Sequence, residues 1–158
     1  MSKYYPNSTI FYTDGSKIPG KGCGASSISI MQPRYSSYFK INDNATIFTA
    51  KSTAIEATLI IILHIQIINS VICSDSHSVL TSLQQNGVKN LKHPITASIR
   101  SKLQEILKRG WKCKLVWVPA HVGIKGNVIA DTCAKKVISQ PLLTRETIVT
   151  SEWCSHRR

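Results

Sequence analysis

Short apolar runs separated by turn-forming residues dominate the first quarter of the chain. Gly15, Gly20 and Pro33 punctuate these runs, and residues of this kind favour turns between strands. Because the connections are short, the strands are expected to form an antiparallel meander. The pattern predicts strands over residues 8–14, 22–31 and 34–42.

The pattern changes at residue 45, where apolar positions crowd together without strand-like alternation. Segment 45–68 is too long for one strand, so it predicts a helix that is buried on much of its surface. Asn44 directly precedes the segment and is available as its N-cap.

The second half of the chain alternates short apolar runs with segments of helical spacing. Apolar residues recur at helical spacing after residue 93, and Gly87 and Gly110 are placed to end helices. A strand, helix, strand step of this kind predicts a parallel, right-handed crossover, so we expect an α/β fold with a mixed sheet flanked by helices. The expected elements are strands over 70–75 and 111–119, and helices over 76–87, 93–110 and 126–138.

Length and charge narrow the class of protein. A chain of 158 residues with 42% apolar residues can bury the core of one domain, which we expect over residues 1–140, with a tail of uncertain structure over 141–158. Twenty Lys and Arg against eight Asp and Glu give a net charge of +12. This surplus favours a polyanionic partner such as nucleic acid, with a merely soluble basic surface as the alternative.

Cysteine usage and hydropathy bear on the compartment. The five cysteines are scattered and never spaced as C-x-x-C, which argues against a disulfide framework or a zinc site and favours a reducing, intracellular setting, whether nucleus or cytoplasm. The most apolar run, 57–68, is too short to span a bilayer and contains His64 and Gln66. The N-terminus lacks the apolar region of a signal peptide, so we expect no membrane.

Acidic residues are scarce, and their positions are therefore informative. Asp14 and Asp75 are expected to close two strands, and if those strands are parallel neighbours both carboxylates emerge at one edge of the sheet. Asp131 lies in the last predicted helix, after a loop that could bring it towards that edge. Three carboxylates are a donor set that suits Mg²⁺ or Mn²⁺. Taken singly, Asp14 could be a turn former and Asp75 an N-cap.

Three blocks of sequence carry a family resemblance. They are "FYTDGSK" with the glycines of "GCGAS", "ICSDSHSVL", and "WVPAHVGIKGNVIAD". They resemble the blocks of ribonuclease H domains, in the form found at the end of insect-type non-LTR retrotransposon polyproteins, over about Ser8 to Ile138. The resemblance implies a ribonuclease H-like fold with a five-stranded mixed sheet, three strands antiparallel and then two parallel. It also implies hydrolysis of the RNA strand of RNA–DNA hybrids with two Mg²⁺ or Mn²⁺ ions.

The resemblance also implies which residues act. The expected metal ligands and catalytic residues are Asp14, Asp75 and Asp131, with His121 assisting proton transfer or product release. The expected substrate contacts are Gly15, Ser16, Ser76 and Asn127. A lone histidine is more often structural, but His121 lies between Pro119 and Gly123 on a loop, which favours the functional role.

One position departs from the family pattern. The family's fourth ligand is a glutamate in a block reading roughly F-T-A-E-x-x-A-I, and the match here is "FTAKSTAI", with Lys51 at that position. Glu56 is not a substitute, because five helical positions turn its side chain by roughly 500°, about 140° past the required direction. The ammonium of Lys51 removes a ligand, repels metal and could pair with Asp14 or Asp75. Alternatively, it could extend to solvent.

Three hypotheses follow from these residues. The first is a ribonuclease H endonuclease with impaired activity, in which at least one ion binds weakly. The second is a hybrid-binding module, derived from a retrotransposon, that is catalytically weak or inactive. The third is a basic DNA-binding protein without nuclease ancestry, in which the three aspartates would not converge. We further expect a monomeric, stand-alone fragment without a small-molecule cofactor.

Overall fold

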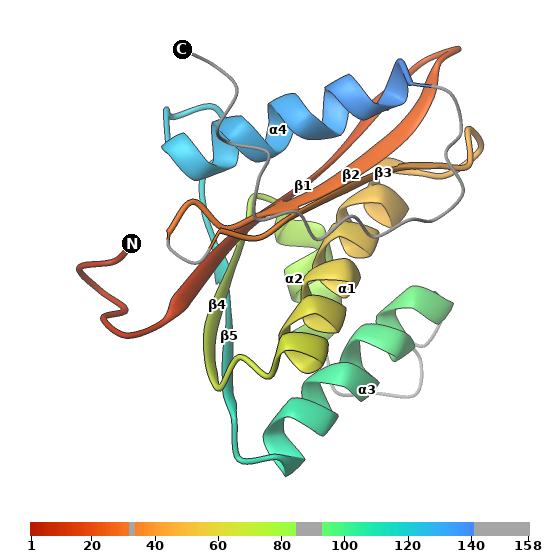
Figure 1. Ribbon diagram of the computed structural model, residues 1–158. Helices are drawn as coiled ribbons and strands as arrows, with labels where there is room; N and C mark the ends of the chain where they lie inside the picture. The colour runs from red at the N-terminus through yellow and green to blue at the C-terminus, as the bar shows by residue number, and fades with distance from the viewer. Residues whose placement is uncertain (32–33, 85–92, 141–158) are drawn as a thin grey trace.

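A mixed sheet covered by helices on both faces forms the computed structural model, which describes residues 1–31, 34–84 and 93–140 (Figure 1). The strands are β1 (Thr9–Ile18), β2 (Gly22–Ile28), β3 (Ser36–Ile41), β4 (Asn69–Ser74) and β5 (Lys112–Trp117). The helices of the described residues are α1 (Ile47–Ile65), α2 (His77–Gln84), α3 (Pro94–Lys108) and α4 (Lys125–Ile138). Gly87, the predicted end of the second helix, and the predicted tail lie outside the described residues.

The strand order β3-β2-β1-β4-β5 places β1 at the centre of the sheet. The pairs β1–β2 and β2–β3 are antiparallel, whereas β1–β4 and β4–β5 are parallel. The predicted fold, a five-stranded mixed sheet with three antiparallel strands followed by two parallel ones, is confirmed.

Two hydrophobic layers cover the sheet. Successive strand residues point to opposite faces of the sheet. Phe11 and Ile72 therefore pack with α1 and α3 on one face. Ile10 and Val71 pack on the other face, in the cluster that includes Ala130 of α4. Figure 1 shows α1 and α3 on one side of the sheet and α4 on the other. The sheet therefore has a core on each face.

Helix α1 is the central helix of the larger layer. Its N-cap is Thr46 instead of the predicted Asn44, because the Thr46 hydroxyl accepts the N–H of Thr49 at 3.1 Å. The helix is long and apolar enough to pass a length-and-composition test for a membrane span. However, Ile55, Leu59 and other apolar residues of α1 are buried against the sheet and α3, as in the core helix of a globular domain.

Strand β1 is longer than predicted: Asp14 was expected to close it and Gly15 to lie in the turn after it, but both lie within the strand. The strand continues past Asp14 and Gly15 to Ile18, held by antiparallel pairing with β2. Gly15 is not a turn residue, since a Cβ at this position would lie only 2.3 Å from the backbone nitrogen of Lys51. Its missing side chain lets α1 cross β1 closely.

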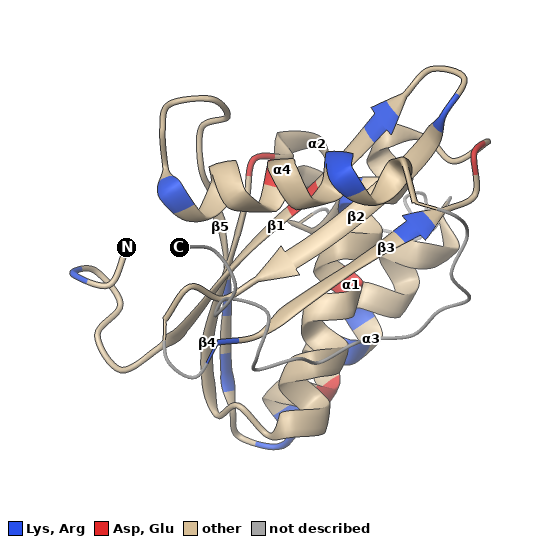
Figure 2. Cartoon of the chain, turned by 45° about the horizontal axis from the view of Figure 1, so that its top comes forward, with Lys and Arg blue, Asp and Glu red and all other residues tan. Residues whose placement is uncertain are grey.

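Lys and Arg are spread over most elements, whereas Asp and Glu are few (Figure 2). Exposed basic side chains include those of Lys17 and Lys21 at the β1–β2 hairpin and Lys125, Lys135 and Lys136 on α4. The net charge of +12 is thus presented on several faces of the domain.

Candidate active site

Parallel pairing of β1 with β4 brings two of the predicted acids together. The register runs from Thr9 opposite Ser70 to Thr13 opposite Ser74. Asp14 and Asp75 are the residues that directly follow this last pair. The Thr13 hydroxyl also donates to the Cys73 carbonyl at 3.2 Å, which ties the strands at this end. Both carboxylates therefore emerge at the same edge of the sheet, although Asp14 lies within its strand.

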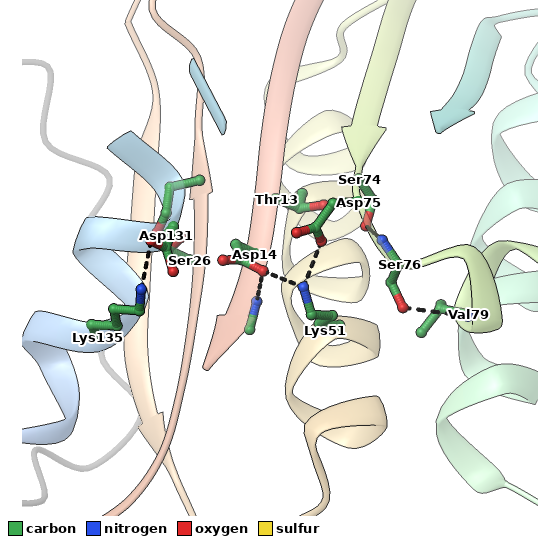
Figure 3. Close-up of polar contacts among 12 residues, drawn as sticks. Thr13, Asp14, Ser26, Lys51, Ser74, Asp75, Ser76, Val79, Asp131 and Lys135 are labelled. Atoms are coloured by element: carbon green, nitrogen blue, oxygen red, sulfur yellow. Dashed lines mark hydrogen bonds and ion pairs between the residues drawn. The ribbon is translucent and has the colours of Figure 1, made fainter. Parts of the chain in front are cut away.

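Lys51 joins these two carboxylates from α1. Its Nζ lies 2.7 Å from Asp14 Oδ1 and 2.5 Å from Asp75 Oδ1 (Figure 3). The side chains of Lys51, Asp14 and Asp75 are 18%, 5% and 8% exposed. The sequence left open whether Lys51 pairs with an aspartate or extends to solvent, and in the structure it pairs with both.

The protonation of this cluster follows from burial and charge. Burial lowers the pKa of the Lys51 ammonium, but the hydrogen bonds and charges of Asp14 and Asp75 outweigh burial, so the pKa lies above its usual value. The pKa of Asp14 is also raised, because burial of its carboxyl and the charge of Asp75 outweigh the hydrogen bonds and charge of Lys51 and the N–H of Gly15. Both shifts retain protons in the cluster, and Lys51 remains a cation at neutral pH.

Backbone contacts fix the segment around Asp75. Ser76, and not Asp75, caps α2, since the Val79 N–H donates to the Ser76 hydroxyl at 3.4 Å. The indole N–H of Trp117 donates to the Asp75 carbonyl at 3.2 Å. The sequence reasoning missed Trp117 as a positioning residue, although it opens the "WVPAH" block.

Two glycines seat α4 against the sheet beside Asp14. A Cβ at Gly24 would lie 2.2 Å from the Ala134 carbonyl oxygen, and one at Gly126 would lie 2.2 Å from the Tyr12 ring. The Ser26 hydroxyl, on the residue paired with Asp14, donates to the Ala130 carbonyl at 2.6 Å.

This packing places Asp131, the residue after Ala130, near the same edge. Figure 3 shows it on the side of Asp14 away from Lys51. Its carboxylate binds a second ammonium, with Lys135 Nζ at 2.7 Å from Asp131 Oδ2. The i, i+4 spacing of these two residues is the sequence signal that predicts this ion pair.

The donor groups in their present arrangement do not fit a divalent metal ion. Among the described residues, no three His, Cys, Asp or Glu side chains are grouped so that they could hold a metal. The space between Asp14 and Asp75 contains the ammonium of Lys51, which repels a cation and occupies carboxylate lone pairs. Glu56 lies away from the site, as predicted, and pairs with Lys102 at 3.0 Å.

The remaining predicted site residues are mostly buried. Ser16, Ser76 and Asn127 are only 8%, 6% and 5% exposed, and Ser16 lies within β1 instead of a turn. Asn127 Oδ1 has no hydrogen-bond partner within the described part of the chain. His121 is exposed on the connection between β5 and α4, with a left-handed backbone (φ 57°).

Comparison of the whole structure with solved proteins identifies the same fold. The RNase H1 of the halophilic archaeon Halobacterium salinarum is 19% identical, with a TM-score of 0.62, over 82% of this chain and 96% of that chain. A foamy viral protease-reverse transcriptase in complex with dsDNA is 25% identical, with a TM-score of 0.63, over 82% and 93%. The same viral protein in complex with an RNA/DNA hybrid is 23% identical, with a TM-score of 0.65, over 82% of this chain and 20% of that chain.

Sequence comparison gives the family. A search of curated proteins finds no match to this chain. The RNase H family pattern matches residues 6–139, which include the β1, β4 and α4 segments that carry Asp14, Asp75 and Asp131. This match excludes the hypothesis of a basic protein without nuclease ancestry, and the chain belongs to the ribonuclease H family.

Proposed function

We propose that this domain binds RNA–DNA hybrids and hydrolyses them weakly or not at all. The observation that carries the proposal is the ammonium of Lys51, which binds Asp14 and Asp75 simultaneously. Binding of nucleic acid depends on the fold and the surface charge, whereas hydrolysis depends on these carboxylates being free to hold cations.

Charge and relatives support the nucleic-acid partner. The domain carries +12, and neutralising phosphates with Lys and Arg releases condensed counterions. The foamy viral relative was solved with dsDNA and with an RNA/DNA hybrid. Among these partners we favour the hybrid, because its minor groove displays 2′-hydroxyls on one strand only, a shape that a protein can distinguish from both pure duplexes.

The charge of the site supports reduced hydrolysis. In their ordinary ionised forms Asp14, Asp75 and Asp131 carry −3, and their partners Lys51 and Lys135 carry +2, which leaves −1. The two divalent ions expected for the family would add +4 to a site that already contains two ammonium groups. Weak ion binding, and with it weak turnover, is the expected result.

A residual metal-dependent ribonuclease activity is the second candidate. Asp14 and Asp75 are held by the β1–β4 pairing, independently of Lys51. If the lysine side chain turned towards solvent, both carboxylates would remain at the same edge with Asp131 nearby. His121, exposed on the β5–α4 connection, would then be available to assist.

A cleavage assay with a matched variant separates the two candidates. Labelled hybrid is incubated with Mg²⁺ or Mn²⁺ and the natural protein, Lys51→Glu, or Lys51→Glu combined with Asp14→Asn as the inactive control. Cleavage by Lys51→Glu alone supports the proposal, and robust cleavage by the natural protein supports the second candidate. Binding is measured in parallel by fluorescence anisotropy with hybrid, dsDNA and dsRNA, and equal affinity for all three would contradict hybrid recognition.

We also propose that the domain derives from an insect-type non-LTR retrotransposon. The support is the third block, "WVPAHVGIKGNVIAD", with its fixed spacing of Trp, Pro, His, Gly and Asp. Sequencing of the genomic flanks tests the origin. Remnants of a reverse transcriptase reading frame upstream are expected, and flanks related only to cellular ribonuclease H genes would contradict it.

A further inference from the structure

We infer that the ammonium of Lys51 takes the electrostatic place of a divalent ion, so that neither the stability of the domain nor its binding of hybrid requires Mg²⁺ or Mn²⁺. The part of this inference that concerns binding rests on the proposed function. The part that concerns stability depends only on the cluster of Lys51, Asp14 and Asp75.

The two buried carboxylates are unfavourable in the folded domain unless a cation accompanies them. Asp14 and Asp75 follow directly on paired residues of neighbouring strands, and their side chains are almost completely buried. Two like charges so placed repel each other and lose hydration. In a site made only of carboxylates, bound cations relieve this repulsion, whereas here Lys51 supplies the positive charge from within the chain.

The ammonium of Lys51 cannot dissociate from the site as a free metal ion can. Lys51 lies near the start of α1, whose backbone packs on Gly15 of β1 so closely that no Cβ fits between them. Its Nζ hydrogen bonds reach both carboxylates, at 2.7 Å and 2.5 Å. A covalently attached ammonium is present at full occupancy whatever the concentration of free ions.

The charge that remains at this edge determines how easily a phosphate backbone approaches it. Lys135, which is half exposed on α4, pairs with Asp131 at 2.7 Å, so the three acids together with Lys51 and Lys135 carry −1 instead of −3. A nearly neutral edge on a domain that carries a net charge of +12 does not need added cations before a polyanion can lie across it.

Thermal unfolding tests the stability half of the inference. The natural protein, Lys51→Glu and Lys102→Met are melted in EDTA and in increasing Mg²⁺ at constant ionic strength. Lys102→Met is the matched control, because it removes a partly buried ammonium that pairs with Glu56 away from the site. The Tm of the natural protein and of the control should be independent of Mg²⁺, whereas the Tm of Lys51→Glu should rise with Mg²⁺ as the added carboxylate restores an ion site.

The natural protein alone keeps the inference testable if Lys51→Glu does not fold. A Tm of the natural protein that rises and saturates with Mg²⁺ would overturn the inference, because it would show an ion site in spite of Lys51. A Tm that stays flat supports it.

Hybrid affinity of the natural protein tests the binding half. At constant ionic strength, the affinity measured by anisotropy should be no higher in Mg²⁺ than in EDTA. Affinity that appears or tightens only with Mg²⁺ would overturn the inference and leave the proposed hybrid binding intact. Absence of hybrid binding in both buffers would refute the proposed function, and the melting experiment would still decide whether Lys51 replaces the ion.

Discussion

Lys51 Nζ lies 2.5 Å from a carboxylate oxygen of Asp75, 24 positions away along the chain. The contact spans two elements, since Lys51 is in α1 and Asp75 follows β4. Together with the 2.7 Å contact to Asp14, it converts the acidic edge of a ribonuclease H fold into an internal ion-pair cluster. One side chain therefore balances the charge of both carboxylates at this edge.

Replacing Lys51 by Met should destabilise the domain in metal-free buffer. Met keeps most of the side-chain volume but leaves two buried carboxylates without a cationic partner, which costs about 3 kcal/mol when a buried pair is broken. Urea unfolding in EDTA measures the loss. Adding Asp14→Asn to Lys51→Met should recover part of the stability by removing one of the stranded charges, and no recovery would show that Lys51 acts by packing alone.

Gly15→Ala should be costly because α1 crosses β1 at this residue. The new methyl group would lie 2.3 Å from the Lys51 backbone nitrogen, and overpacking against backbone costs about 3 kcal/mol. Gly20→Ala is the control, since its Cβ would meet nothing within 4 Å and only its positive φ of 73° is unfavourable, at about 1 kcal/mol. Equal losses of unfolding free energy in the two variants would contradict the close approach.

Ser52→Ala should stabilise the domain. Ser52 is fully buried in α1, and its hydroxyl has no hydrogen-bond partner within the described residues. Removing an unsatisfied hydroxyl and introducing a better helix former should raise the free energy of unfolding by about 0.5–1 kcal/mol.

The contrasting variant to Ser52→Ala is Thr58→Val. The Thr58 hydroxyl hydrogen-bonds Ser27 Oγ at 2.6 Å and the Ala54 carbonyl at 2.9 Å. Its removal strands the Ser27 hydroxyl in the core, so a loss of about 1 kcal/mol is expected in the same urea titration. A gain in both variants would mean that hydrogen bonding does not distinguish the two hydroxyls.

Stability should fall at alkaline pH, in part through Cys73. Burial raises the pKa of this thiol from 9.0 to about 11, so the folded state holds the proton more tightly than the unfolded chain. The contribution is complete below pH 9.0 and is lost as the pH rises through about 11, a total of about 3 kcal/mol.

Cys73→Ala checks this contribution. The variant lacks a packed sulfur at every pH but has no thiol to titrate. Its deficit in unfolding free energy relative to the natural protein should therefore narrow by about 2 kcal/mol between about pH 8 and about pH 11. A deficit that stays constant over this range would rule out the thiol as a source of the pH dependence.

The sequence by itself determined the architecture. Short apolar runs bounded by turn residues, a long apolar helical segment and apolar residues at helical spacing predicted every element from β1 to α4, because burial of one or both faces requires such patterns. The boundaries were less accurate at β1, since pairing with β2 and the passage of α1 over Gly15 depend on partners distant in the chain. Likewise, the sequence offered Asn44 as the N-cap of α1, whereas the cap in the structure is Thr46, two residues later.

The candidate site, like the fold, was predicted in part from the sequence and decided in part by the tertiary structure. Motif spacing identified Asp14, Asp75, Asp131 and the unexpected Lys51. The parallel pairing of β1 with β4 explains why Asp14 and Asp75 emerge at one edge. Only the tertiary structure decided that one ammonium serves both Asp14 and Asp75 while Asp131 binds Lys135. The physical reason is distance: a hydrogen bond acts over about 3 Å, and the direction of a lysine side chain at that scale is set by the packing of α1 on β1, which the linear order of residues does not specify.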